Sequence, residues 1–251
     1  MVRLIRAEFL KLRTTQVWFW LFLAAIALSA LFVIGPLASH NDVRTGADVA
    51  QMFASASIAY IVIFVLGVLG VTTEFRYQTI TATVLATPSR WALITAKMIS
   101  YAILGLLYAA VCLIVQLAIA IPWLSAKGIH YSLGSDQIPH ALIAVFVVLA
   151  LFGIVGLGAG ALIKNQIVAV TVGVIFLVAI QNIFIAIPGV KHIYPFLPGG
   201  AVNAIVRVGS ADSSVNGVHL MGVAGGVIVL LLWAFIPAIL GASITMNRDI
   251  T

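Results

Sequence analysis

The chain has 251 residues, of which 63% are hydrophobic and only 8% are charged, and its mean hydropathy is +1.20. An ordinary soluble domain has about 25% charged residues, so this chain has too little polar surface for a soluble globule. The composition indicates an integral membrane protein instead. The single cysteine, Cys112, excludes an internal disulfide framework, and its place in an apolar run predicts a packed side chain.

A basic segment, residues 1–15, precedes the first apolar run and carries four basic residues with one acid. Four of its apolar residues fall on one stripe at helical spacing, so we expect an interfacial helix on the cytosolic leaflet. A secretory signal peptide is the alternative. The apolar run at residues 17–35 is too long for a typical signal core and lacks a clear cleavage site, so a retained span fits better. The stripe consists of Val2, Ile5, Phe9 and Leu12.

Six apolar runs are long enough to cross a bilayer, which needs about 20 residues of helix. The third run exceeds that length, so we expect it to tilt or to protrude. No internal repeat and no soluble region interrupts the runs, so residues 1–251 are predicted to form one all-α transmembrane domain. The predicted spans are residues 17–37, 52–72, 93–121, 141–163, 167–187 and 220–245.

The basic residues are distributed unevenly between the two sides of the predicted membrane. Six spans place both termini on the same side, and the segments on that side hold nine of the thirteen Lys and Arg residues and three of the seven acids. The positive-inside rule therefore places both termini in the cytoplasm, and we expect a multi-pass protein of a bacterial plasma membrane. Anionic membrane lipid attracts this charge, so the net charge of +6 requires no nucleic-acid partner.

Residues 74–90, with the sequence EFRYQTITATVLATPSR, form one of the few polar segments of the chain and lie between two apolar runs. The pattern predicts a short helix over residues 79–86. Thr87 can cap the next helix, with Pro88 at its first position, where no backbone N–H is needed. From the pattern alone, a solvated turn between two spans is an equally good interpretation.

This segment resembles the cytosolic loop of type-2 ABC exporter permeases. It has a Glu at the end of the second span, an aromatic residue, an Arg, a Thr-Ile pair and the run LATPSR, although Gln78 stands where many relatives carry Gly. In that family the loop forms a coupling helix that docks on the ATPase subunit. The resemblance covers this loop closely and the rest of the chain by its span layout. It implies that six residues couple this chain to the ATPase: Glu74, Arg76, Ile80, Val84, Leu85 and Arg90.

The resemblance implies a permease subunit that exports a hydrophobic or amphiphilic substrate, such as a drug or a lipid. It would act with a second permease subunit, identical or related, and with two copies of a cytosolic ABC ATPase. The chain has no G-x-x-x-x-G-K-[ST] phosphate loop, so we expect it to hydrolyse no ATP itself and to need no cofactor. A secondary transporter or channel, or a membrane assembly or sensor protein, is the alternative. No acid or base lies in the middle of a predicted span, which argues against a proton-driven transporter.

Three uncharged polar residues, Gln116, Gln181 and Asn182, lie within predicted spans. An unsatisfied amide in hydrocarbon costs several kcal/mol, so each should face another helix or a wet cavity. Interhelical hydrogen bonds and a place in the translocation path both satisfy this requirement. In the related exporters the second and fifth spans of two subunits line the path, so the resemblance implies Tyr60, Phe64, Gln181 and Asn182 as lining residues.

Small residues form two G-x-x-x-G patterns, Gly156 with Gly160 and Gly222 with Gly226. They predict close helix packing, either within the chain or at a dimer face. Residues 193–201 carry apolar side chains between two prolines, Pro195 and Pro198, which disfavour one long helix. The resemblance implies a re-entrant outer element there, and an interfacial loop is the alternative.

The histidines all fall in or next to the predicted outer loops. Such a cluster can bind metal or sense pH, but the spacings fit no ligand motif, so we expect no metal site. The five residues are His40, His130, His140, His192 and His219.

Overall fold

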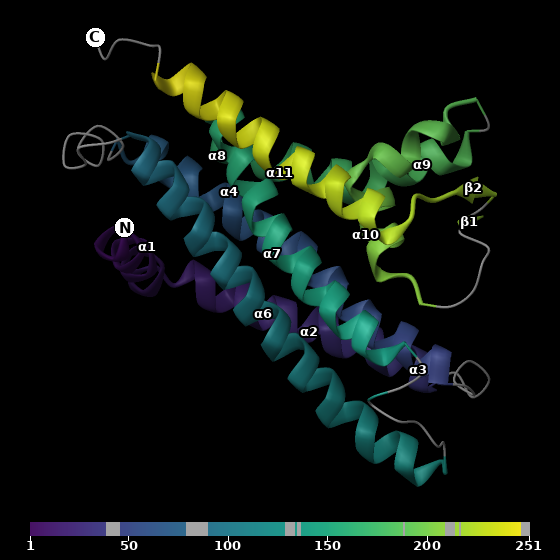
Figure 1. Cartoon of the computed structure of the whole chain (residues 1–251). Helices are drawn as coiled ribbons and strands as arrows, with labels where there is room; N and C mark the ends of the chain where they lie inside the picture. Colours follow the sequence, from purple (N-terminus) through teal and green to yellow (C-terminus); the bar gives the residue numbers. More distant parts are fainter. Residues whose placement is uncertain are drawn as a thin grey trace.

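Long helices make up most of the chain and lie side by side in one bundle (Figure 1). Six helical segments are long and apolar enough to cross a membrane, so the chain is an all-α integral membrane protein, as predicted. The computed structural model describes residues 1–38, 46–78, 90–128, 137–187, 189–208 and 217–246, together with Gly134, Ser214 and Val215.

The six predicted spans are all present, and two of them contain a change of helix type. The second consists of α3 (Gly46–Ala54), the 3-10 helix η1 (Ser55–Ala59) and α4 (Tyr60–Arg76). The fifth consists of α8 (Gln166–Ile175), the π-helix η2 (Phe176–Ile180) and α9 (Gln181–Ala186). The other spans are α2 (Val17–Ala38), α6 (Arg90–Ala126), α7 (Ile138–Leu162) and α11 (Val223–Met246).

The second span begins at Gly46, earlier than the predicted residue 52. The sequence prediction was misled by Asp48, which marks a loop when charge alone is considered. Val49 and Ala50, however, are fully buried, and α3 packs against α7, so the first turns of α3 already belong to the bundle. At the other end of the chain, α11 begins at Val223 and not at residue 220.

The central helix is α7, which packs against α4, α6 and α11 through glycines on different faces. A Cβ at Gly156 or Gly160 would overlap the backbone of α4, and a Cβ at Gly158 would overlap α11. These close approaches lie within one chain, so the first G-x-x-x-G pattern serves intramolecular packing here. In the second pattern, Gly226 faces α10, whereas a Cβ at Gly222 would meet nothing within 4 Å among the described residues.

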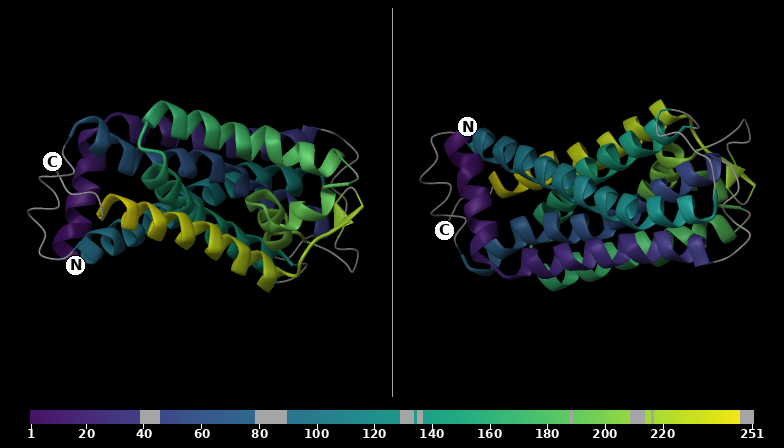
Figure 2. Two further views of the ribbon diagram at one scale, coloured as in Figure 1. Left: turned by 90° about the horizontal axis from the view of Figure 1, so that it is seen from above. Right: turned by 90° about the horizontal axis from the view of Figure 1, so that it is seen from below.

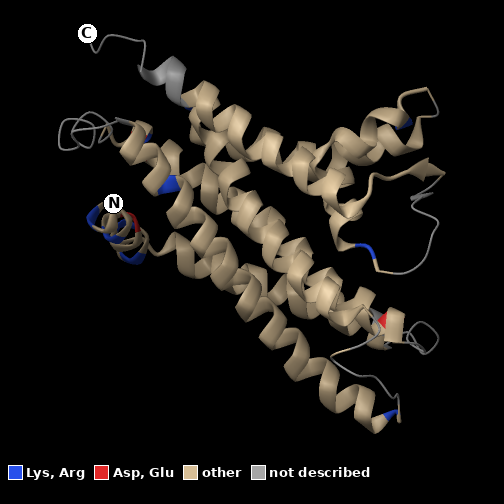
Figure 3. Cartoon of the chain, viewed as in Figure 1, with Lys and Arg blue, Asp and Glu red and all other residues tan. Residues whose placement is uncertain are grey.

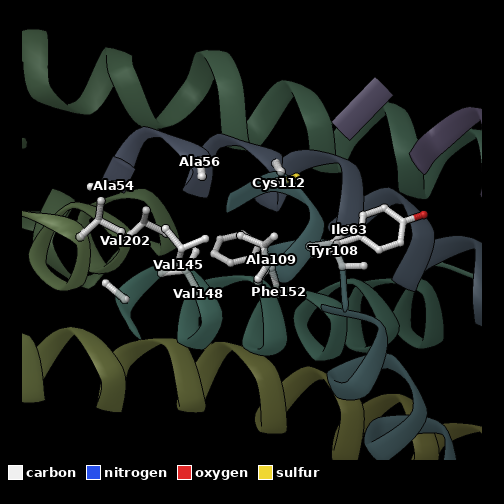
Figure 4. Close-up of a cluster of buried hydrophobic side chains, with 14 of the residues drawn as sticks. Ala54, Ala56, Ile63, Tyr108, Ala109, Cys112, Val145, Val148, Phe152 and Val202 are labelled. Carbon is white, nitrogen blue, oxygen red and sulfur yellow. The ribbon is translucent and has the colours of Figure 1, made fainter. Parts of the chain in front are cut away.

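The hydrophobic core lies along α7, where it meets α4 and α6. Figure 4 shows Ile63, Val148, Phe152 and Cys112 among the buried side chains of this core. Cys112 is buried and unpaired, as a packed side chain should be. Tight burial of branched and aromatic side chains gives α7 a fixed position against which the other spans are arranged.

The third span, α6, is long enough to project beyond the bundle (Figure 1). Its exposed apolar side chains extend from Ile99 to Ile121, which corresponds to about 33 Å at a helical rise of 1.5 Å per residue. That length matches a hydrocarbon core of about 30 Å. Trp91 and Trp123 lie beyond the two ends of this band, where tryptophan is typical of the membrane–water interface. Lys97 therefore lies at one edge of the apolar band.

The segment before the last span is helical and packs against the spans. It comprises the 3-10 helix η3 (Lys191–Phe196) and α10 (Pro198–Val206), and α10 packs on α11 and α7. Pro198 takes the first helical position, where no N–H is required. The short strands β1 (Ser214–Val215) and β2 (Val218–His219) follow α10 and pair with each other at the same end of the bundle as this segment (Figure 1).

The first helix, α1 (Val2–Thr14), lies across the ends of the long helices, at the end opposite to β1 and β2 (Figure 2). It contacts α6 and α2. The end of α11 lies at the same end of the bundle as α1, as an even number of spans requires. In the described part of the chain, charged residues lie toward the two ends of the bundle and leave its middle uncharged (Figure 3).

Candidate functional site: a buried ion-pair network

Four charged residues from three helices meet at the α1 end of the bundle. The ammonium of Lys97, on α6, lies 2.7 Å from Glu74 Oε1 of α4 and 2.9 Å from Glu8 Oε2 of α1. The ammonium of Lys11, on α1, lies 2.7 Å from Glu74 Oε1 and 3.0 Å from Glu8 Oε1. Two carboxylates and two ammonium groups thus form a closed, charge-balanced network, hereafter the ion-pair network.

Most of the ion-pair network is shielded from solvent. Glu8, Glu74 and Lys97 are 4%, 6% and 7% exposed. An ammonium group has three donors, and Lys97 uses them on Glu8, Glu74 and the carbonyl oxygen of Gly70 at 3.3 Å. Charges in such surroundings must be paired, because removal of one partner costs about 3–5 kcal/mol. The network therefore fixes the relative positions of α1, α4 and α6, whatever its net contribution to stability.

Lys11 is the member that reaches solvent. Partial burial on its own would lower the pKa of Lys11, but the hydrogen bond to Glu74 and the negative charges of Glu74 and Glu8 outweigh burial, so the pKa is raised. Lys11 therefore remains charged at physiological pH. It joins the buried carboxylates to the solvent-facing side of α1.

A glycine of α4 leaves room beside the network for a side chain of α6. Tyr101 of α6 is fully buried against Gly70 of α4, and a Cβ at Gly70 would overlap the tyrosine hydroxyl. The same Gly70 supplies the carbonyl oxygen that binds Lys97. One turn before Glu74, Gly70 thus makes room for the Tyr101 ring, and Lys97 binds both the Glu74 carboxylate and the Gly70 carbonyl oxygen of α4.

A second and weaker set of contacts links the end of α4 to the turn between α7 and α8. Arg76 donates to Gln166 Oε1 at 3.4 Å, and Lys164 lies over the ring of Phe75, 5.3 Å from its centroid. Glu74 and Arg76 therefore contact different neighbours. Glu74 contacts α1 and α6, whereas Arg76 contacts Gln166 at the start of the fifth span. Their roles in coupling to the ATPase remain predictions.

The other residues predicted to contact the ATPase cannot be placed. Ile80, Val84 and Leu85, like the whole predicted helix at residues 79–86, lie outside the described residues. Arg90 begins α6, but its side chain also lies outside the description. What the structure does establish is where this segment is attached: α4 ends at Arg76 and α6 begins at Arg90.

The four predicted path residues each contact a different neighbour. Tyr60 stacks on Phe152 of α7, with 4.5 Å between ring centroids. Phe64 is buried and covers Gly173 of α8. Gln181 is buried, donates to the carbonyl oxygen of Leu177 and accepts from the backbone N–H of Gly199.

Asn182, the fourth path residue, is exposed and donates to the Val178 carbonyl oxygen of its own helix at 2.7 Å. Gln116 forms the interhelical bonds that one interpretation predicted. Its amide nitrogen donates to the Ser29 carbonyl oxygen of α2 and to the Ser55 hydroxyl of η1, both at 3.2 Å. The three polar residues of the span interiors therefore all have hydrogen-bond partners within this chain, and the place of Gln181 and Asn182 in a translocation path remains a prediction.

Glu8, Lys11 and Lys97 were missed as site residues by reasoning from the sequence. Two signals were available. Glu8 is the one acid in a basic segment, and Lys97 lies within the predicted third span, where a charge needs a partner. Among the described residues no group of three or more His, Cys, Asp or Glu side chains could hold a metal ion.

The ion-pair network lies within the part of the chain that matches a known family. Residues 4–182, from α1 into α9, match the family described as ABC-2 family transporter protein. No curated protein matches the chain in sequence. The match covers well over half of the chain, together with both helices that flank residues 77–89. The chain therefore belongs to the ABC-2 family of transporter proteins and is a multi-pass membrane permease of an ABC transporter.

Proposed function

We propose that this chain is the permease subunit of an ATP-driven exporter, and that the ion-pair network carries the motion of an ATPase into the membrane spans. The attachment of residues 77–89 is the observation that supports this role. The segment leaves α4 two residues after Glu74 and enters α6 seven residues before Lys97. The two helices that hold the segment are therefore clamped to each other, and to α1, by the same charges.

A buried ion-pair network is suited to transmit a displacement, because its members cannot separate gradually at low cost. Once separated in a low-dielectric site, each charge lacks a partner, so the paired arrangement is strongly preferred. A force on residues 77–89 that moves α4 relative to α6 must either carry α1 with it or exchange the partners of Lys97. Either outcome changes the arrangement of the spans in one concerted step, and alternating access requires such a step.

The partners of this exporter follow from what the chain lacks and from its family. It has no phosphate loop, so we propose that a separate ABC ATPase, present in two copies, binds and hydrolyses ATP. Two permease chains, identical or related, would form the path between them. The excess of basic residues on the α1 side supports a cytosolic position for that end. The exported substrate would be hydrophobic or amphiphilic, such as a drug or a lipid, because the spans offer aromatic and apolar side chains and few charges.

The test is a charge placed on the segment between α4 and α6. The sequence pattern puts Ile80 and Val84 on one face of a helix and Ala82 on the opposite face. Ile80→Asp should place an unpaired charge in an apolar contact with the ATPase, at a cost of a few kcal/mol. The variant should insert in the membrane normally but lose the ATPase that copurifies with the wild type, and with it ATP-dependent transport.

Ala82→Asp is the matched control, since it adds the same charge on the other predicted face and should retain the ATPase. Equal retention of the ATPase by wild type, Ile80→Asp and Ala82→Asp would contradict a coupling role for this segment. Transport by the purified chain without any ATPase would favour a secondary transporter or channel.

A further inference from the structure

The outward side of α1 carries two parallel stripes of different chemistry. Val2 and Phe9 are seven residues apart, which places them two turns apart on the same side of the helix. Arg6 and Arg13 follow them by four residues each, so a basic stripe runs directly beside the apolar one. Val2 is 65% exposed, and both arginines are exposed, so the junction of the two stripes is accessible.

The arginines of α1, Arg3, Arg6 and Arg13, form no ion pair with any acid in the described part of the chain. The one acid of the helix, Glu8, is buried and bound to Lys97 and Lys11. The ion-pair network thus neutralises the inner side of α1 and leaves three guanidinium groups on its outer side.

The surroundings of α1 are those of a membrane surface. The helix lies across the ends of the spans (Figure 2), and α2 begins three residues after it. Trp18 and Trp20 follow at the start of α2, and Trp20 is 66% exposed. Tryptophan is typical of the headgroup level of a bilayer. At that level the apolar stripe would lie at the boundary with the lipid acyl chains, and the basic stripe would lie among the lipid phosphates.

We propose that Arg6 and Arg13, assisted by Arg3, bind the phosphodiester groups of anionic phospholipids in the leaflet at the α1 end. Guanidinium groups bind phosphate oxygens through paired hydrogen bonds, and each base near an anionic surface adds to the attraction. An acidic protein surface would satisfy the arginines but not the exposed Val2 and Trp20 beside them. The proposal rests on the six-span fold and not on the exporter assignment.

The lipid contact has a consequence for the ion-pair network. The lipid-binding arginines and the pair Glu8 and Lys11 lie on different sides of one short helix, so lipid that holds α1 at the membrane surface also holds Glu8 and Lys11 against α4 and α6. In a bilayer without anionic lipid, α1 would leave this position more often. Anionic lipid would thereby set how firmly α1 is joined to the two helices that flank residues 77–89.

Amide hydrogen exchange of the purified chain in lipid nanodiscs tests this proposal without any ATPase. The two bilayers are pure phosphatidylcholine and phosphatidylcholine with about one third phosphatidylglycerol. We expect the amides of α1 to exchange on the order of tenfold more slowly in the anionic bilayer, because two arginine–phosphate contacts oppose the opening of the helix. Raised salt should reduce the difference, and the amides of α7 should not respond to the lipid.

Two matched double variants complete the experiment. Arg6→Gln with Arg13→Gln should abolish the dependence of α1 on lipid. Lys127→Gln with Lys191→Gln makes the same change in charge at the opposite end of the bundle and should leave the dependence of α1 on lipid unchanged.

The proposal is overturned if α1 exchanges equally in the two bilayers, or if the arginine variant keeps the lipid effect. It is also overturned if lipid has no effect but an added ATPase subunit protects α1, since the basic stripe would then serve a protein partner.

Discussion

The two ends of the bundle are held together by different chemistry. At the α1 end, four charges from three helices form the ion-pair network. At the opposite end, neutral hydrogen bonds join the short helices η3 and α10 to each other and η3 to the last span. Asn203 donates to the Tyr194 hydroxyl at 2.6 Å, and Trp233 donates to the Phe196 carbonyl oxygen at 2.9 Å.

The difference lies in what happens when a contact is lost. A neutral hydrogen bond contributes about 1 kcal/mol, and its groups readily find other partners. A buried charge that loses its partner costs several times more, so the ion-pair network favours discrete arrangements over gradual ones. We infer that the α1 end is built to move as one body, whereas the end that carries η3 and α10 can adjust contact by contact.

The largest effect that this comparison predicts comes from Lys97→Met. The variant leaves Glu8 and Glu74 buried with Lys11 alone, an imbalance that should cost about 3–5 kcal/mol. Thermal unfolding in detergent can be followed by the reaction of a thiol-reactive dye with Cys112, the single and buried cysteine. The midpoint should fall by many degrees. A double variant, Lys97→Met with Glu74→Gln, restores charge balance and should recover much of this loss.

If Lys97→Met unfolds at the wild-type temperature, the ion-pair network does not hold α1, α4 and α6 together. If the double variant recovers stability and also normal transport, the network has a structural role alone, and the proposed role in coupling is wrong. Recovered stability with transport still impaired is the result that the proposed function requires.

A smaller loss of stability is expected from substitution of the α7 glycines, which lie between the two ends of the bundle. Gly156→Leu forces a side chain against the carbonyl oxygen of Phe64 on α4, and overpacking of this kind costs about 1–3 kcal/mol. Gly222→Leu is the matched control, because an added Cβ there meets no described atom within 4 Å. Dye reaction at Cys112 should report a lower unfolding midpoint for the first variant alone. Equal midpoints would mean that α4 and α7 can separate freely.

The sequence allowed the six spans to be predicted, because long apolar runs of the required length have few other interpretations in a chain of this composition. It also indicated Glu74 and the segment after it. The helix breaks at η1 and η2 were not predictable in the same way. Their sequences, SASIA and FLVAI, contain no Gly or Pro, so the local changes of helix type arise from packing against neighbouring helices.

The ion-pair network shows most clearly where reasoning from one sequence ends. Glu74 and Lys11 are 63 residues apart, and Lys97 and Glu8 are 89 residues apart. Each charge was visible in the sequence near an apolar run, but Glu8, Lys11 and Lys97 were not predicted to form ion pairs. Which acid meets which base depends on the crossing of α1 over the ends of α4 and α6, and hydrophobic periodicity carries no information about that crossing.

The smallest effect is expected at the end opposite to α1, from Tyr194→Phe. The change removes the hydroxyl that accepts from Asn203 but keeps the ring that packs with Leu197, Ala204 and Leu220. Since a neutral hydrogen bond inside a membrane protein is worth about 1 kcal/mol or less, the unfolding midpoint should fall by only a few degrees. Tyr194→Ala, which also removes the ring, should cost more. If Tyr194→Phe lowers the unfolding midpoint as much as Lys97→Met does, both ends of the bundle are equally rigid. The proposed difference, an α1 end that moves as one body and an opposite end that adjusts contact by contact, would then be wrong.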